Sequence, residues 1–270
     1  MTRQKHYKYL FAVLTSIFLT LLLVSCSNDG ASNEGELFVK VLDSPGNFDA
    51  INVVVDRVSI HQTGVGGDVG WRYVTTGSSG AFNLLNLLNG RNLQLVLSKV
   101  PTGSYDQIKI YFGTCTGTKN GTEYPLVNPA IQTGTIISYG FQIVDGQQLQ
   151  LTFDFDASRS VTTTGINSYT FNPKVRVQNT LLSGWIAGAV LDSGLTPVSA
   201  KVLTYTGIDS VATFSEVSLN GNFQLSDLPE KTYSVAIIPD NPLLLADTVY
   251  NINVIRQQPT PMGAIHLKYK

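Results

Sequence analysis

Two aspartates on one predicted strand have the spacing that most suggests chemistry. Asp154 and Asp156 alternate with the apolar residues Leu151, Phe153 and Phe155. Side chains two positions apart on a strand share a face at roughly 7 Å, and calcium accepts carboxylate oxygens of this kind. A calcium ion takes roughly six to eight oxygens, and no further ligands lie near the pair in the sequence. We therefore expect structural carboxylates on the solvent face, hydrogen-bonded to neighbouring serines, and no metal site.

Histidine and cysteine are too sparse for nucleophilic or zinc chemistry. Beyond the first 25 residues the histidines are His61 and His266, and neither lies beside a nucleophile motif such as Gly-x-Ser-x-Gly. Cys115 lies in a polar stretch with no histidine nearby, so we expect a partly buried, unreactive thiol. No two zinc ligands are close in sequence. The sequence thus predicts neither an enzyme nor a bound cofactor.

Exposed aromatic residues are the alternative source of binding chemistry, because surface modules that bind sugars use them. Trp71 and Tyr73 follow a glycine-rich loop and are the leading candidates for ligand contact, whereas Trp185 at a strand start is expected in a core. The wider pool, most of which we expect to pack in cores or on sheet faces, also contains Tyr105, Tyr111, Tyr124 and Tyr139.

The first 25 residues have the pattern of a lipoprotein signal peptide. Residues 1–9 carry the positive charges, and Leu10–Val24 is an uncharged, mostly apolar run that is shorter than the roughly twenty residues of a membrane span. The sequence Leu23-Val24-Ser25-Cys26 resembles the bacterial lipobox. We therefore expect cleavage before Cys26 and a lipid on its thiol that holds the chain to a membrane.

Residues 26–35 hold no large apolar side chain and are predicted to form a flexible tether. Ser27 follows the cysteine, and in the sorting rule known for enteric bacteria that residue implies the outer membrane. The periplasmic and the cell-surface faces of that membrane both stay open. Removing the leader leaves 15 Lys and Arg against 19 Asp and Glu, a net charge of about −4, which argues against a nucleic-acid partner.

Alternating apolar residues predict a first all-β domain over residues 36–178. Alternation is clear at Leu37–Leu42, and its phase slips near Asp56-Arg57, which indicates a β-bulge. Phe82–Leu88 breaks the alternation and is expected to form a single helical or irregular turn. Further strands are predicted at Trp71–Val74, Tyr105–Phe112, Leu149–Phe155 and Pro173–Val177.

The order of these pieces resembles a family of bacterial lipoprotein domains known as domain of unknown function 4382. Asn83 stands where that family usually has Asp. Because the family has no assigned activity, the resemblance implies a fold and a cellular setting rather than a function. The matching stretches are Leu42–Gly46, Phe82–Gly90, Val100–Tyr105 and Phe153–Val161.

A second all-β domain is predicted over residues 183–270, after the polar linker Gln178–Thr180. Its alternating segments, from Gly184–Val190 onward, resemble the carboxypeptidase regulatory-like or prealbumin-like β-sandwich, with about seven strands. That group is classed with carbohydrate-binding-like folds, and the resemblance implies a non-catalytic accessory domain. Lys231 replaces the usual glycine before its Thr-Tyr pair.

The fold class expected is therefore all-β, with two β-sandwich domains in series after a signal peptide and a tether. The function that fits best is a cell-envelope lipoprotein that acts as a non-enzymatic binding or adhesion module for a glycan or an envelope protein. One alternative is a fimbrial or surface-layer subunit that pairs through an edge strand. An envelope hydrolase is the other.

Overall fold

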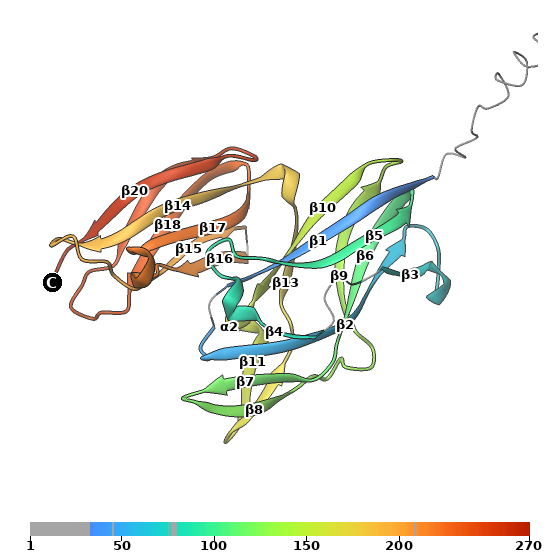
Figure 1. Ribbon diagram of the computed structural model, residues 1–270, viewed down its shortest axis with the longest axis horizontal. Helices are drawn as coiled ribbons and strands as arrows, with labels where there is room; N and C mark the ends of the chain where they lie inside the picture. The colour runs from blue at the N-terminus through green and yellow to red at the C-terminus, as the bar shows by residue number, and fades with distance from the viewer. Residues whose placement is uncertain (1–32, 45, 75, 77–79, 208) are drawn as a thin grey trace, which may run out of the picture. The chain divides into compact units, whose positions relative to one another are not determined.

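The computed structural model describes residues 33–44, 46–74, 76, 80–207 and 209–270 (Figure 1). The leader, Cys26 and most of the predicted tether lie outside the described residues. Residues 34–270 form one compact unit. Within the described ranges, no helix combines the length and the apolar character that crossing a membrane requires.

The first sandwich packs two sheets face to face (Figure 1). One sheet has the order β13 (Val175–Asn179), β10 (Gln148–Asp156), β1 (Glu34–Ser44) and β5 (Leu93–Pro101). The other has the order β11 (Val161–Gly165), β12 (Ser168–Phe171), β8 (Thr122–Val127), β7 (Cys115–Lys119), β2 (Ala50–Gln62), β6 (Gly103–Phe112) and β9 (Thr135–Ile143). Two short strands, β3 (Trp71–Val74) and β4 (Ala81–Asn83), also pair with β2.

Strand alternation builds the core between these sheets, as the sequence predicts. The odd-numbered apolar residues of β1 and β10 are buried and parallel in register, so that Val41 lies beside Phe153. From the opposite sheet, Phe112 meets Phe155 edge to face, with 5.8 Å between ring centroids. Such aromatic pairs add about 0.5–1.5 kcal/mol beyond their buried area.

The local irregularities expected in this domain are confirmed. The pairing of β2 with β6 shifts register between Val55 and Arg57, where the phase slip predicts a bulge. Leu84–Leu87 forms one turn of 3-10 helix. Asn83 caps this turn because its side-chain oxygen accepts hydrogen bonds from the backbone N–H groups of Leu85 and Ile51, both at 3.1 Å.

Two predicted boundaries are wrong. Glu34 and Gly35, expected in the tether, already belong to β1, and Gly35 packs so closely on the carbonyl oxygens of Val144 and Gln147 that a Cβ would clash. The linker expected at Gln178–Thr180 is the end of β13 followed by a 3-10 turn, η3 (Thr180–Leu182). Polar composition suggested free segments, but pairing and turn hydrogen bonds order both.

The second sandwich has seven strands and its own core, as expected. One sheet has the order β17 (Asn222–Pro229), β14 (Ser183–Asp192) and β20 (Pro259–Leu267). The facing sheet has the order β16 (Asp209–Phe214), β15 (Ala200–Thr206), β18 (Lys231–Pro239) and β19 (Asp247–Val254). The core between them is rich in β-branched residues and leucine, such as Ile186, Val202, Leu225 and Val235.

In both sandwiches a tyrosine near the start of a strand binds the backbone four residues before it. The Tyr105 hydroxyl donates to the Pro101 carbonyl oxygen at 2.9 Å, and the Tyr233 hydroxyl donates to the Pro229 carbonyl oxygen at 2.8 Å. A similar tyrosine corner occurs in immunoglobulin sandwiches. Burial raises the pKa of Tyr105 and raises that of Tyr233 to about 12, so both hydroxyls keep the donated proton at neutral pH.

The two sandwiches meet at a polar junction, whose first contact is the turn after η2 (Leu84–Leu87). Asn89 has a left-handed backbone (φ 56°), and its amide nitrogen donates to Phe214 O and to the Glu216 carboxylate. Its amide oxygen accepts from Thr213 Oγ1 at 2.7 Å and from Gln224 N at 3.0 Å. One side chain of the first sandwich thus satisfies four groups of the second.

The second contact of the junction is Asp227, on a bulge of β17. Its backbone is left-handed (φ 52°), a conformation that Asp tolerates better than most residues. The carboxylate accepts from Ser183 Oγ at 3.1 Å and lies 3.1 Å from Lys40 Nζ of the first sandwich. Arg176 completes the contact because its Nη1 donates to the Asp227 carbonyl oxygen at 3.0 Å.

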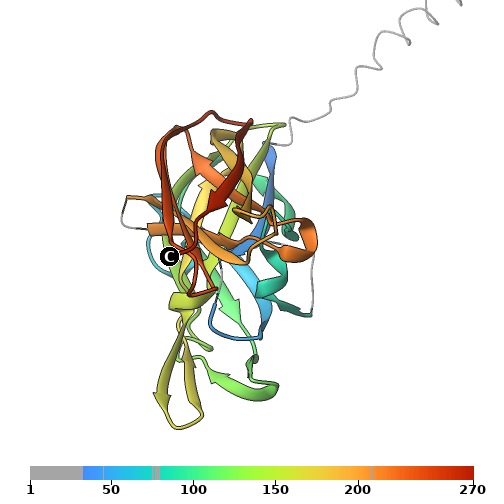
Figure 2. The ribbon, with the colours of Figure 1, turned by 90° about the vertical axis from the view of Figure 1, so that its left-hand side faces the viewer.

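Figures 1 and 2 also show the β7–β8 and β11–β12 hairpins projecting together from the first sandwich. They are joined by parallel pairing of β12 with β8, with Tyr169 beside Leu126. Phe48 and Tyr124 pack edge to face on Tyr169, at 5.2 and 5.4 Å between ring centroids. These hairpins therefore carry their own small aromatic contact.

The Lys40–Asp227 pair is expected to couple the sandwiches energetically. Both side chains are mostly buried, at 20% and 4% exposure, so Asp227→Asn should lower the free energy of unfolding by about 1–3 kcal/mol. Lys40→Met should lower the free energy of unfolding less in the Asp227→Asn background than in the native chain. The difference, measured by a double-mutant cycle from denaturant melts, should be a coupling energy of about 1 kcal/mol.

The exposed pair Arg256–Glu230, with 2.8 Å between Nε and the carboxylate oxygen, is the control. Its side chains are 58% and 43% exposed, so Arg256→Met with Glu230→Gln should show a coupling below about 0.5 kcal/mol. A Lys40–Asp227 coupling no larger than that of the exposed pair would show that the junction ion pair does not hold the sandwiches together.

Candidate functional site

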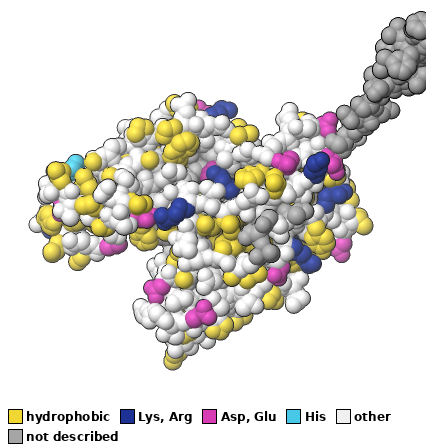
Figure 3. Space-filling model, viewed as in Figure 1, with side chains coloured by type: hydrophobic (Ala, Val, Ile, Leu, Met, Phe, Trp, Pro, Cys, Tyr) yellow, Lys and Arg dark blue, Asp and Glu magenta, His cyan; other side chains and the backbone are white. Residues whose placement is uncertain are grey.

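Five side chains from three adjacent strands form a row on the outer face of the second sheet of the first sandwich. We call them the aromatic–cation row: Arg57 on β2, Trp71 and Tyr73 on β3, and Lys109 and Tyr111 on β6. They share the face because β3 and β6 both pair with β2 in register. In Figure 3, Lys and Arg side chains lie next to hydrophobic ones over the part of the surface where Figure 1 places β3 and β6.

Cations stack on the rings of this row. The Arg57 guanidinium carbon lies 3.8 Å from the Tyr111 ring centroid and 5.0 Å from that of Tyr73, and Lys109 Nζ lies 3.9 Å from the Trp71 ring. Each such contact contributes about 0.5–1 kcal/mol at an exposed site. The row is therefore an ordered surface, in which neither cation forms an ion pair with any described residue.

Trp71 and Tyr73 differ in what they offer to a ligand. The Trp71 ring is half-buried between Lys109 and His61, whose ring centroid is 5.0 Å away. His61 in turn lies 2.8 Å from the Asp106 carboxylate through Nδ1. Tyr73 is 65% exposed. Tyr73 is thus open to a partner, whereas Trp71 serves mainly to hold Lys109.

The other aromatic candidates are structural. Tyr105 forms the corner described above, Tyr124 packs on Tyr169, and Tyr139 stacks on Phe141. Trp185, expected in a core, is half-buried and lines a cavity of about 320 Å³ beside Asp227. Arg57 and Lys109 were not predicted from the sequence as members of a site. The phase slip near Asp56-Arg57 could have indicated Arg57, because the bulge there sets the sheet face on which its side chain lies.

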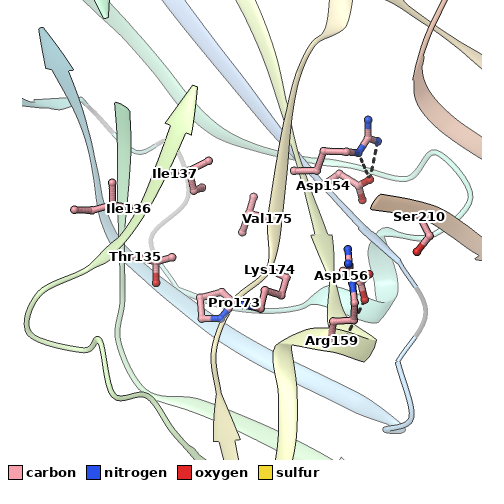
Figure 4. Close-up of a pocket in the computed structure, with 11 residues that line it drawn as sticks. Thr135, Ile136, Ile137, Asp154, Asp156, Arg159, Pro173, Lys174, Val175 and Ser210 are labelled. Atoms are coloured by element: carbon pink, nitrogen blue, oxygen red, sulfur yellow. Dashed lines mark hydrogen bonds and ion pairs between the residues drawn. The ribbon is translucent and has the colours of Figure 1, made fainter. Parts of the chain in front are cut away.

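Asp154 and Asp156 line a different cavity, of about 340 Å³ (Figure 4). Figure 4 shows Thr135–Ile137 on one side, Pro173–Val175 in the middle, and the two aspartates with Ser210 on the other side. The expectation of carboxylates on a solvent face is wrong, because both are more than 90% buried. They do point away from Phe153 and Phe155, but that face is covered by basic side chains and by the junction.

Each of these aspartates has an arginine partner. Asp154 accepts from Arg176 NH2 at 2.8 Å, and Asp156 accepts from Arg159 Nε at 2.6 Å. Burial raises the pKa of Asp154, and the Arg176 charge opposes that rise. Asp156 also accepts from Ser158 Oγ at 2.6 Å and caps the one-turn helix α2 (Ala157–Ser160), in line with the expected serine hydrogen bond.

The other residues considered for chemistry are Cys115, His61 and His266. Cys115 opens β7 with its thiol buried, and burial raises its pKa to about 11, so almost no thiolate forms at neutral pH. Among the residues that the structure describes, no three His, Cys, Asp or Glu side chains lie close enough to hold a metal ion. His61 and His266 lie in different sandwiches, on β2 and β20.

The fold and this exposed face define an all-β chain of two sandwiches joined by a polar junction. A family model described as a domain of unknown function, DUF4382, matches residues 34–173, about half of the chain. The chain therefore belongs to the DUF4382 family, which confirms that resemblance. The description of the family states no activity. No curated protein matches the sequence.

Several solved structures of bacterial proteins, pilins among them, overlap distantly with the chain. The TIE protein of Bacillus anthracis is 12% identical, with 87% of this chain and 34% of that one covered and a TM-score of 0.25. The minor pilin of Streptococcus agalactiae is 10% identical, with 87% and 96% covered and a TM-score of 0.25. The major pilin BcpA of Bacillus cereus is 12% identical, with 88% and 71% covered and a TM-score of 0.24. This chain spans about a third of the Bacillus anthracis protein, and overlaps this low do not define a shared fold.

Proposed function

We propose that this protein is a lipid-anchored, non-enzymatic binding module of the bacterial cell envelope, and that the aromatic–cation row is its ligand-binding surface. The observation that carries the proposal is the row itself, in which an exposed ring and two cations lie together on a well-ordered sheet face. Burial in a core does not explain this surface, because an exposed tyrosine gains little free energy from folding. A glycan is the ligand class that best uses a planar ring beside hydrogen-bond donors.

Two further features support a module without catalysis. The buried acids Asp154, Asp156 and Asp227 are held in ion pairs, whereas catalysis needs such groups free to act on a substrate. The cavity beside Asp154 and Asp156 is lined by the arginines that neutralise them. The geometry of this cavity favours a structural role for its charges.

The anchor is tested by fractionation of the full-length chain in a bacterial host. Cys26→Ala is expected to move the protein from the membrane fraction to the soluble fraction, because no other strongly apolar anchor follows the leader. The matched control is Ser27→Ala, which keeps the cysteine and should stay with the membranes. A Cys26→Ala protein that remains in washed membranes at high salt would contradict the anchor.

The binding surface is tested by affinity electrophoresis of residues 27–270 through gels that contain neutral and acidic polysaccharides. At least one polysaccharide should retard the native chain, and Tyr73→Ala should weaken that binding about threefold to tenfold, since one aromatic contact contributes about 0.5–1.5 kcal/mol.

Tyr250→Ala is the control, because Tyr250 lies on β19 of the second sandwich with nearly the same exposure, 67% against 65% for Tyr73. The proposed function would be contradicted if Tyr73→Ala and Tyr250→Ala weakened polysaccharide binding equally, or if no polysaccharide retarded the native chain.

A further inference from the structure

The rings of the aromatic–cation row are largely occupied by the chain's own cations, so the chemistry left for a ligand is different from simple stacking. Lys109 covers the Trp71 ring, and Arg57 covers the Tyr111 ring. A neutral sugar that stacks on these rings would have to displace them. An acidic ligand would instead meet the outward N–H groups of the same cations without disturbing the stack.

We propose that the row selects acidic polysaccharides, whose sugar units carry carboxylate groups. This inference rests on the proposed function, of which it names the ligand class. Arg57 and Lys109 would bind the carboxylates, and Tyr73 would meet the ring face of a sugar unit.

These two cations form no ion pair with the described residues. Within the described part of the chain, neither Arg57 nor Lys109 has a carboxylate within ion-pair distance, and the nearby Asp106 is engaged with His61. Hydrogen bonds between ionised partners are roughly twice as strong as neutral ones. The mature chain has a net charge of about −4, so attraction to an acidic polymer must come from this local surface and not from the protein as a whole.

Stacking also prepares the two cations for binding. A free Lys or Arg side chain loses rotamer freedom when it binds, at a cost of about 0.5–1.5 kcal/mol each. The rings of Trp71 and Tyr111 already restrict Lys109 and Arg57 in the unbound chain. The planar guanidinium of Arg57 additionally suits a carboxylate, which it can hold through two parallel hydrogen bonds.

One feature favours a glycan over an acidic polypeptide. A uronic acid carries a ring face and a carboxylate on one rigid unit, which matches an open Tyr73 ring beside a cation, whereas a polypeptide presents its carboxylates on mobile side chains.

The test compares two forms of one polymer, polygalacturonate and its methyl ester, as ligands of residues 27–270. The sugar backbone is the same, and only the charge differs. The native chain should bind the acid form at least about tenfold more tightly than the ester at 50 mM salt. The difference should shrink at 500 mM salt, where the Debye length is only a few ångströms.

Variants locate the effect on the row. Arg57→Gln and Lys109→Gln should each weaken binding of the acid form about threefold to tenfold, while Lys109→Arg should keep it. The control is Lys99→Gln, which removes an exposed charge from β5 in the other sheet and should leave binding unchanged. Thermal melts of all variants show whether each protein is folded.

The outcomes separate this inference from the function on which it rests. Equal binding of the acid and the ester would overturn the proposed selectivity, as would a loss of affinity in Lys99→Gln as large as in Arg57→Gln and Lys109→Gln. Neither result would contradict the proposed binding function. Binding of polyglutamate as tightly as polygalacturonate replaces the glycan with an acidic polypeptide and also overturns the inference. Failure to bind any polysaccharide overturns the proposed function itself.

Discussion

One carboxylate, that of Asp227, is the point on which the arrangement of the two sandwiches depends. It lies on a bulge whose left-handed backbone turns it out of the second sandwich and toward Lys40 of the first. Arg176 binds the carbonyl oxygen of the same residue and the Asp154 carboxylate. A charge buried at such a place is costly unless it is paired. The left-handed backbone of Asp227 is therefore kept together with the contact to Lys40 that joins the two sandwiches.

This junction explains how the charges of the buried aspartates are accommodated. Asp154 shares Arg176 with the junction, and Asp156 closes the strand on which both aspartates lie by capping α2. The same sheet face that holds these charges is therefore used for packing against the second sandwich. The aromatic–cation row lies on the other sheet, and none of its five residues takes part in the junction contacts described above.

Sequence reasoning succeeds here where the determining interactions are local. Strand alternation, the slip near Asp56-Arg57 and the break at Phe82–Leu88 depend on near neighbours, and the structure has a bulge and a 3-10 turn at those places. The burial of Asp154 could not be predicted, because the groups that cover it come from β13 and from a bulge 73 residues further along the chain. Arg57 and Lys109 escaped notice for the same reason, since their partner rings come from other strands.

We infer that the polar junction makes residues 34–270 one folding unit, and the two tryptophans allow a direct test. Trp71 reports on the first sandwich and Trp185 on the second, so Trp185→Phe and Trp71→Phe give single-tryptophan chains for denaturant unfolding followed by fluorescence. The two chains should show coincident transitions, and the transitions should separate when Asn89→Ala and Asp227→Asn are added to each chain. Two separate transitions with the junction intact would contradict it.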